Sequence, residues 1–304
     1  MKEKESKHSK KYLIALAEKH SILALCAGLL LFVCTFAAII IWIGNYDHIE
    51  EPPLHYFTAL SNLVSAIAAA FMIPYAVDGI RKKHFVLPRY IVLFQFSAAT
   101  CVSVTMFTSL ALILPTQGAM AVTGTNFWLH IVTPLCAVIL FQCVETGVSI
   151  SRREAILCLI PYWVYIAVYF VMVVIVGKER GGWSDFYMAK AFWPAWISVI
   201  LFLIIGFAMA LILRLVHNRL AVKFWKRVTR MWTDDMMPEE MLVEAFGLGR
   251  YVGRNINSEI ELSVPINIFE EMSKRYGLPM EKLINAYIYG ALDSIRQKSS
   301  TKAH

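Results

Sequence analysis

The fold of this chain is decided by an uncharged stretch near its N-terminus, SILALCAGLLLFVCTFAAIIIWI (residues 21–43). A helix of about 20 apolar residues, rising ~1.5 Å per residue, crosses the hydrocarbon core of a bilayer. Five further apolar runs follow, at residues 56–77, 90–114, 127–150, 155–176 and 188–216. A chain of 304 residues has no soluble core large enough to bury six such helices. The sequence therefore predicts an all-α polytopic membrane protein with six transmembrane helices.

The basic residues predict its orientation. Lys and Arg gather before the first run, between runs two and three, between runs four and five, and after run six. The loops at residues 44–55 and 115–126 contain neither, and only Lys178 and Arg180 depart from the alternation. Because basic loops stay in the cytoplasm, we expect a cell-membrane protein with both termini cytoplasmic. The formal net charge of +7 then reflects topology and attraction to anionic lipid, and is no evidence for nucleic-acid binding.

The six cysteines predict neither a metal site nor a cofactor. All of them lie inside apolar runs, and no two are arranged as C-x-x-C. Free cysteine behaves as a small hydrophobic side chain, so packing is the expected role here, ahead of disulfide formation or metal ligation.

Polar side chains recur at helical spacing near the start of two runs. Polar groups are costly in a bilayer, so such positions are candidates for function. By the i, i+3, i+4 rule each set shares one helical face. The sets are His55, Thr58, Asn62 and Ser65 in the second run, and Asn126, His130 and Thr133 in the fourth.

Thr58 and His130 form the candidate catalytic pair. In the predicted topology both helices enter from outside, and each residue lies four positions, about 6 Å, from the start of its helix. A threonine hydroxyl becomes a nucleophile when an imidazole accepts its proton in a partly desolvated site. The structural alternative is that Thr58 bonds to its own backbone and His130 bridges helices, as such residues often do in membranes.

Short motifs in these runs resemble a known superfamily. They are Phe57-Thr58-x-x-Ser61-Asn62, Leu129-His130-x-x-x-Pro134 and Pro161-Tyr162-x-x-Tyr165-x-x-x-Tyr169, with Gly177 and Asp185-Phe186-Tyr187. Over about its first two thirds the chain resembles the six-helix membrane proteins that include the androgen-induced-gene family of lipid hydrolases and bacterial relatives. In the animal members an intramembrane threonine and histidine hydrolyse fatty acid esters of hydroxy fatty acids. The resemblance implies these roles for Thr58 and His130.

The chain departs from the bacterial members after Gly177. Those relatives carry a tyrosine- and proline-rich stretch there, whereas this chain has Lys-Glu-Arg-Gly-Gly-Trp-Ser-Asp at residues 178–185. The resemblance therefore implies nothing about how this outer loop contributes to substrate entry.

Five residues are candidate binding positions for a lipid-like substrate. Ser61, Asn62 and Asn126 neighbour the candidate pair along the two helices. Tyr165 belongs to a tyrosine stripe on the fifth run, for which packing and lining an acyl-chain pocket are the two interpretations. Lys190 is flanked by tryptophans and either holds a lipid carboxylate or phosphate, or extends to the interface within an aromatic belt. The tryptophans are Trp183, Trp193 and Trp196.

The remainder of the chain predicts a small cytoplasmic domain. Residues 1–20 form a basic N-terminus, residues 21–216 the membrane domain, and residues 217–254 an amphipathic, basic linker. Residues 255–297 read as strand, helix, Gly-Leu turn and helix, and residues 298–304 as a tail. The 255–297 pattern resembles the ribbon-helix-helix fold, in which two chains pair their strands into one core. Because Glu259 and Glu261 would occupy the strand face that reads DNA, homodimerisation is favoured over DNA binding.

Two classes of function follow. The first is an intramembrane lipid-ester hydrolase that uses Thr58 and His130 near the outer leaflet. The alternative is a non-enzymatic membrane sensor or scaffold whose cytoplasmic tail dimerises or binds a partner, DNA among the candidates. Transport is less well supported, since no run shows the broken centre or the intramembrane carboxylates typical of ion-coupled carriers.

Overall fold

The computed structural model describes most of the chain and confirms the six spans. Its described residues are 2–44, 51–82, 87–144, 149–187, 189–190, 194–229, 245, 269–270, 273–274 and 280–301. The helices long and apolar enough to cross a membrane are Lys19–Gly44, Phe57–Arg81, Arg89–Thr116, Gly124–Gln142, Arg152–Val176 and Ala195–Ala221. The part of the chain that is described is all-α and contains no strand. The protein is thus a multi-pass membrane protein by the length and composition of its helices.

Several spans change helix type along their length. The first two spans and the last are single helices, α1 (Lys2–Gly44), α2 (Phe57–Lys82) and α9 (Ala195–Thr229). The third span is α3 (Arg89–Thr108), a π-helical turn η3 (Ser109–Ile113) and α4 (Leu114–Gln117). The fourth span is α5 (Gly124–Phe127), the π-helical η5 (Trp128–Val132) and α6 (Thr133–Val144). The fifth span is α7 (Arg152–Leu157), α8 (Ile160–Phe170) and the π-helical η6 (Val171–Val176). Short 3₁₀ turns are η2 (Pro53–His55), η4 (Gly118–Val122) and η7 (Lys178–Arg180).

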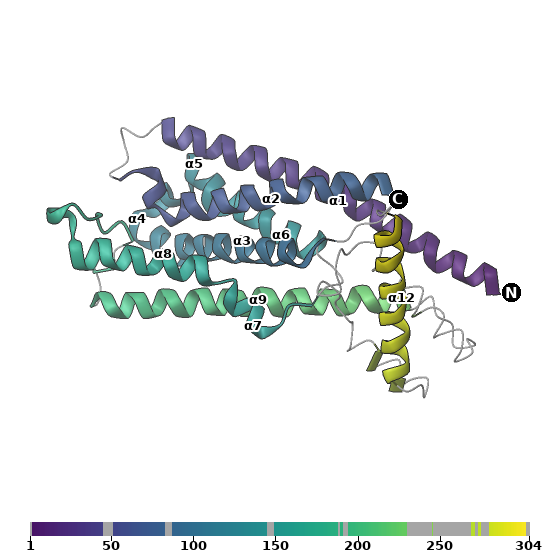
Figure 1. Cartoon of the computed structure of the whole chain (residues 1–304). Coiled ribbons are helices and arrows are strands. Elements are labelled where there is room, and N and C mark those ends of the chain that lie inside the picture. The colour runs from purple at the N-terminus through teal and green to yellow at the C-terminus, as the bar shows by residue number, and fades with distance from the viewer. Residues whose placement is uncertain are drawn as a thin grey trace.

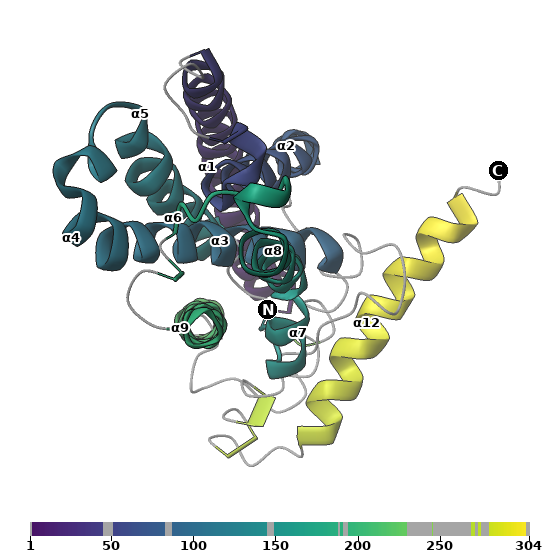
Figure 2. The ribbon, with the colours of Figure 1, turned by 90° about the vertical axis from the view of Figure 1, so that its left-hand side faces the viewer.

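The third span is the centre of the bundle. Most of α3 is buried, from Ile91 to Thr108, whereas most residues of the other spans are partly or fully exposed. Its main part, α3, contacts α2, α6 and α9, and the end-on view shows it among these helices (Figure 2). The two chain ends lie toward the same end of the bundle, opposite α4 (Figure 1).

Small residues bring α1 close to α2. A Cβ placed on Gly28 would lie 3.2 Å from Met72 Cε and 3.6 Å from the Ala69 carbonyl oxygen. Ala24 on the same face of α1 is fully buried, as is Ala69. Close backbone approach through small side chains is the usual way in which membrane helices gain packing energy, because lipid provides no hydrophobic driving force between them.

A glycine also brings α9 against α8. A Cβ on Gly206 would lie 2.3 Å from Cε1 of Tyr162, so only glycine leaves space for the ring. The Tyr162 hydroxyl donates to the Phe202 carbonyl one turn earlier in α9, at 2.7 Å. This contact fixes the α8–α9 wall of the pocket described below.

The structure corrects two predicted boundaries and leaves one prediction outside its range. Helix α2 begins at Phe57, because Tyr56 is extended (ψ 130°) after η2, so His55 lies off the helical face that carries Thr58. The sixth span begins at Ala195, not at residue 188, and residues 183–187 and 189–190 are not helical. The predicted helix after Pro279 is present as α12 (Met280–Thr301). The predicted strand at residues 259–265 lies outside the described residues.

Candidate functional site

Thr58 and His130 are in hydrogen-bond contact between α2 and η5. The Thr58 Oγ1 and His130 Nε2 atoms are 3.2 Å apart, and both side chains are buried. Thr58 is the second residue of α2, and His130 is the third residue of the π-helical turn η5. A nucleophile and its base require about this separation.

The second imidazole nitrogen defines the tautomer. His130 Nδ1 lies 2.7 Å from the Ala121 carbonyl oxygen, which only accepts hydrogen bonds. Nδ1 therefore carries the proton of the neutral ring and donates it to Ala121. The lone pair of Nε2 is left facing Thr58, so the Thr58 hydroxyl donates to His130.

Asn62 braces the two helices beside this pair. Its amide nitrogen donates to the Thr58 carbonyl at 2.7 Å and to the Leu129 carbonyl at 2.9 Å. Its amide oxygen accepts a hydrogen bond from the Thr133 hydroxyl on α6. Asn62 is fully buried. Since it bonds to the backbone next to both members of the pair, Asn62 acts as a positioning residue.

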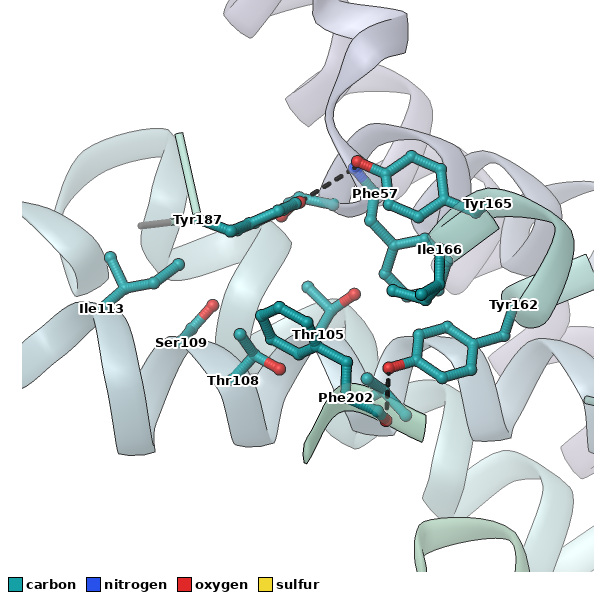
Figure 3. Close-up of a pocket in the computed structure, with 12 residues that line it drawn as sticks. Phe57, Thr105, Thr108, Ser109, Ile113, Tyr162, Tyr165, Ile166, Tyr187 and Phe202 are labelled. Atoms are coloured by element: carbon teal, nitrogen blue, oxygen red, sulfur yellow. Dashed lines mark hydrogen bonds between the residues drawn. The ribbon is translucent and has the colours of Figure 1, made fainter. Parts of the chain in front are cut away.

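A narrow pocket opens on the other side of Thr58 (Figure 3). It holds about 360 Å³ of empty space, counted out to its open mouth. Its walls are mainly aromatic and aliphatic, with hydroxyl groups along α3 and η3, a lining typical of small-molecule sites. The lining residues are Phe57, Thr58, Val104, Thr105, Thr108, Ser109, Ile113, Tyr162, Tyr165, Ile166, Tyr187 and Phe202.

Two tyrosine hydroxyls meet the start of α2. The Phe57 amide donates to Tyr187 Oη at 2.9 Å and to Tyr165 Oη at 3.1 Å, as the dashed lines of Figure 3 show. Tyr165 in turn donates to the His55 carbonyl at 2.8 Å. The first N–H groups of a helix have no hydrogen-bond acceptor within the helix, so the two tyrosine oxygens accept the hydrogen bonds of the Phe57 amide instead. They also attach α8 and the 183–187 segment to the residue preceding Thr58.

A glycine turn returns the chain to this site after the fifth span. Gly177 and Gly181 have φ values of +71° and +84°, which residues with side chains rarely adopt. A Cβ on Gly182 would lie 2.1 Å from the Met172 carbonyl oxygen. The Gly182 and Trp183 amides close the turn on Gly177 and Met172. Residues 177–183 therefore form the turn that brings Tyr187 into the pocket.

A polar contact joins the two loops beside the pocket. Glu51 accepts hydrogen bonds from the Ser184 amide at 2.7 Å and from His55 Nδ1 at 3.0 Å. The His55 ring stacks on Trp183 with centroids 4.4 Å apart. Burial acts to raise the pKa of Glu51, but the hydrogen bonds from Ser184 and His55 outweigh it and hold the pKa below its ordinary value.

The structure brings some of the predicted binding residues together and separates others. Tyr165 lines the pocket, and Ser61 bonds to the Thr58 carbonyl and to Thr105 at its edge. Asn126 is not among the residues that line it, and its amide donates to the Met120 carbonyl in the turn between the third and fourth spans. Lys190 Nζ donates to the Val173 carbonyl at 2.6 Å, at the end of the fifth span.

Tyr187 and the hydroxyls of the third span were not among the predicted site residues. Thr105, Thr108 and Ser109 share a face by their spacing of three and four, a signal that was present in the sequence. Ser109 is 1% exposed, and its hydroxyl has no hydrogen-bond partner among the described residues. Tyr187 belongs to the Asp185-Phe186-Tyr187 motif of the resemblance, but no spacing rule placed it in the site, because its position depends on the fold of the glycine turn.

Comparisons with models of known protein families, with curated proteins and with solved structures find no match to this chain. Within the described ranges, no group of three or more His, Cys, Asp or Glu side chains is placed to hold a metal ion. The function is therefore argued from the geometry of the site.

Proposed function

We propose that this protein is an intramembrane hydrolase of lipid esters, with Thr58 as the nucleophile and His130 as the general base. The observation that carries the proposal is the 3.2 Å contact between Thr58 Oγ1 and an imidazole nitrogen whose lone pair is free to accept the proton. Thr58 also lines a narrow, mainly apolar pocket, so an acyl chain lying there presents its ester to the hydroxyl. The sequence resemblance to lipid hydrolases implies the same two residues.

The geometry supports a two-stage reaction. Thr58 Oγ1 bonds to the ester carbonyl carbon as its proton moves to His130 Nε2. The tetrahedral intermediate collapses, the carbon–oxygen ester bond breaks, and the alcohol leaves with the proton from His130. Water then attacks the acyl-Thr58 ester and gives a proton to His130. Cleavage of the acyl–Thr58 bond returns that proton to Thr58 and releases the fatty acid.

Ala121 takes the place that a carboxylate has in the Ser-His-Asp triad. Its carbonyl oxygen accepts the Nδ1 proton and so orients the ring, but it carries no full negative charge. The imidazolium formed during the reaction is therefore stabilised less than in a triad. We expect a slow hydrolase with a turnover well below that of soluble serine esterases.

The test uses the full chain purified into lipid nanodiscs. The protein should hydrolyse para-nitrophenyl octanoate and react covalently with a fluorophosphonate probe. Thr58→Val preserves shape without the hydroxyl, and His130→Gln preserves a polar side chain without the base, so each should abolish both signals. Ser103→Ala is the matched control, because the Ser103 hydroxyl bonds only to the Ala99 carbonyl of its own helix. Hydrolysis that persists in Thr58→Val would refute the proposal.

A further inference from the structure

An ester attacked by Thr58 develops negative charge on its carbonyl oxygen, and hydrolases place hydrogen-bond donors where this charge appears. We propose that the Tyr187 hydroxyl is the donor that stabilises this oxyanion. The inference rests on the hydrolase function proposed above and adds a third catalytic residue to it.

Tyr187 is positioned for this role by its place in the pocket. Its ring lies across the pocket opposite Thr108 and Ser109, with its hydroxyl beside the start of α2 (Figure 3). Tyr187 Oη is 2.9 Å from the amide nitrogen of Phe57, the residue that precedes Thr58, and Thr58 and Tyr187 line the same pocket. A carbonyl attacked by Thr58 therefore lies next to the Tyr187 hydroxyl.

The direction of the hydrogen bonds leaves the Tyr187 proton available. Its oxygen accepts from the Phe57 amide, and the Thr58 proton is directed at His130. Tyr165 has committed its own proton to the His55 carbonyl. Among the described residues no hydrogen bond from the Tyr187 hydroxyl to an acceptor is present, so its proton is uncommitted. When an ester binds, rotation about the C–O bond of the Tyr187 phenol directs this proton to the ester carbonyl oxygen.

The environment keeps Tyr187 a neutral donor. Burial raises its pKa, so the phenol retains its proton at neutral pH. The Phe57 amide belongs to the first turn of a long helix, the positive end of its dipole. A donor bonded to the phenol oxygen polarises the O–H group and strengthens it as a donor in turn.

A short chain of hydrogen bonds holds Tyr187 in place before substrate arrives. The Tyr187 amide donates to Tyr169 Oη at 3.2 Å, and Tyr169 donates to Asp185 at 2.7 Å. The Tyr187 ring contacts those of Tyr169 and Phe186, with centroids 5.3 and 4.7 Å away. A donor fixed in advance needs no reorganisation during the reaction, which is the condition for effective charge stabilisation.

The experiment compares Tyr187→Phe with wild type in the full chain, in nanodiscs. Loss of one oxyanion donor typically lowers kcat about 100- to 1,000-fold, and we expect a decrease of this order with little change in KM for para-nitrophenyl octanoate. The trifluoromethyl ketone with the same acyl chain forms a tetrahedral adduct with Thr58, so its inhibition constant should rise by the same factor as kcat/KM falls. Tyr90→Phe, which removes a phenol outside the pocket, is the matched control.

The outcomes separate this inference from the proposed function. Wild-type rates in Tyr187→Phe, with Thr58→Val inactive, would overturn the role of Tyr187 and leave the hydrolase intact. A fall in kcat/KM without a parallel loss of ketone affinity would assign Tyr187 a purely structural role and also overturn the inference. Absence of Thr58-dependent hydrolysis in the wild type would overturn both. A parallel loss of turnover and ketone affinity supports the oxyanion role.

Discussion

The Thr58 hydroxyl lies between two groups of opposite character. His130 Nε2, an acceptor, is 3.2 Å away, and the Tyr187 phenol, a donor whose proton is uncommitted, lines the same pocket. Neighbouring hydroxyls have simpler surroundings: Thr100 and Ser103 each bond to the backbone four residues earlier in α3. At the scale of single residues, Thr58 thus differs from the structural hydroxyls of the bundle by its partners.

We expect alanine substitutions of Asn62 and Ser109 to differ in their effect on the stability of the fold. Asn62→Ala leaves the buried Leu129 carbonyl and Thr133 hydroxyl without their Asn62 partner, and we expect a loss of about 1–3 kcal/mol. Ser109→Ala removes a buried hydroxyl that has no partner among the described residues, so its unfolding midpoint should be unchanged or higher. Thermal unfolding in detergent micelles measures both. Equal destabilisation by the two changes would contradict this account of the buried hydrogen bonds.

At the scale of elements, the pocket depends on how closely α9 approaches α8. Gly206→Ala places a methyl group within 2.3 Å of the Tyr162 ring, which is 1% exposed and held by its bond to Phe202. Overpacking of this kind costs about 1–3 kcal/mol, and it should also displace a pocket wall and lower esterase activity. The midpoint of thermal unfolding and the rate of ester hydrolysis are the readouts. Gly44→Ala, with nothing within 4 Å of its added methyl, should change neither.

Acid should destabilise the contact between the two loops beside the pocket, because it protonates Glu51. Because hydrogen bonds hold its pKa below the ordinary value of 4.5, the carboxylate stabilises the fold above that pH, and the contribution is lost as pH falls through the lower folded-state pKa. Wild type should therefore unfold at a higher temperature than Glu51→Gln at pH 7. The two midpoints should converge in acid, where both side chains are neutral. If the difference between the two unfolding temperatures stayed constant down to the lowest pH, the charge on Glu51 would not contribute to stability.

At the scale of the whole molecule, the distribution of basic residues predicts which side the site faces. In a background lacking the six native cysteines, a cysteine at Thr123 should react with a membrane-impermeant maleimide in intact cells. A cysteine at Lys83 should react only after the membrane is opened, because basic loops remain cytoplasmic. Labelling is measured by a gel shift. Reaction at Lys83 in intact cells would reverse the orientation and place Thr58 near the inner leaflet.

Sequence alone was sufficient for the membrane spans, and it singled out Thr58 and His130 as candidates. A span is recognised from the composition of a continuous stretch, because the cost of placing backbone and charge in lipid is local to that stretch. The same reasoning was less accurate at boundaries. The extended Tyr56 after η2 moved the start of α2 to Phe57, and the sixth span begins at Ala195, although its apolar run begins at residue 188.

Only the tertiary structure decided which polar groups meet. The tautomer of His130 depends on Ala121, nine residues away in a turn, and the start of α2 depends on tyrosines more than 100 residues later. Tyr187 reaches the pocket because Gly177 and Gly181 adopt positive φ values and Gly182 lies against a carbonyl. Hydrophobic periodicity carries no information about such contacts, since they join segments whose separation is set by chain reversal and helix packing. The membrane spans are therefore a property of the sequence read locally, whereas the site is a property of the assembled bundle.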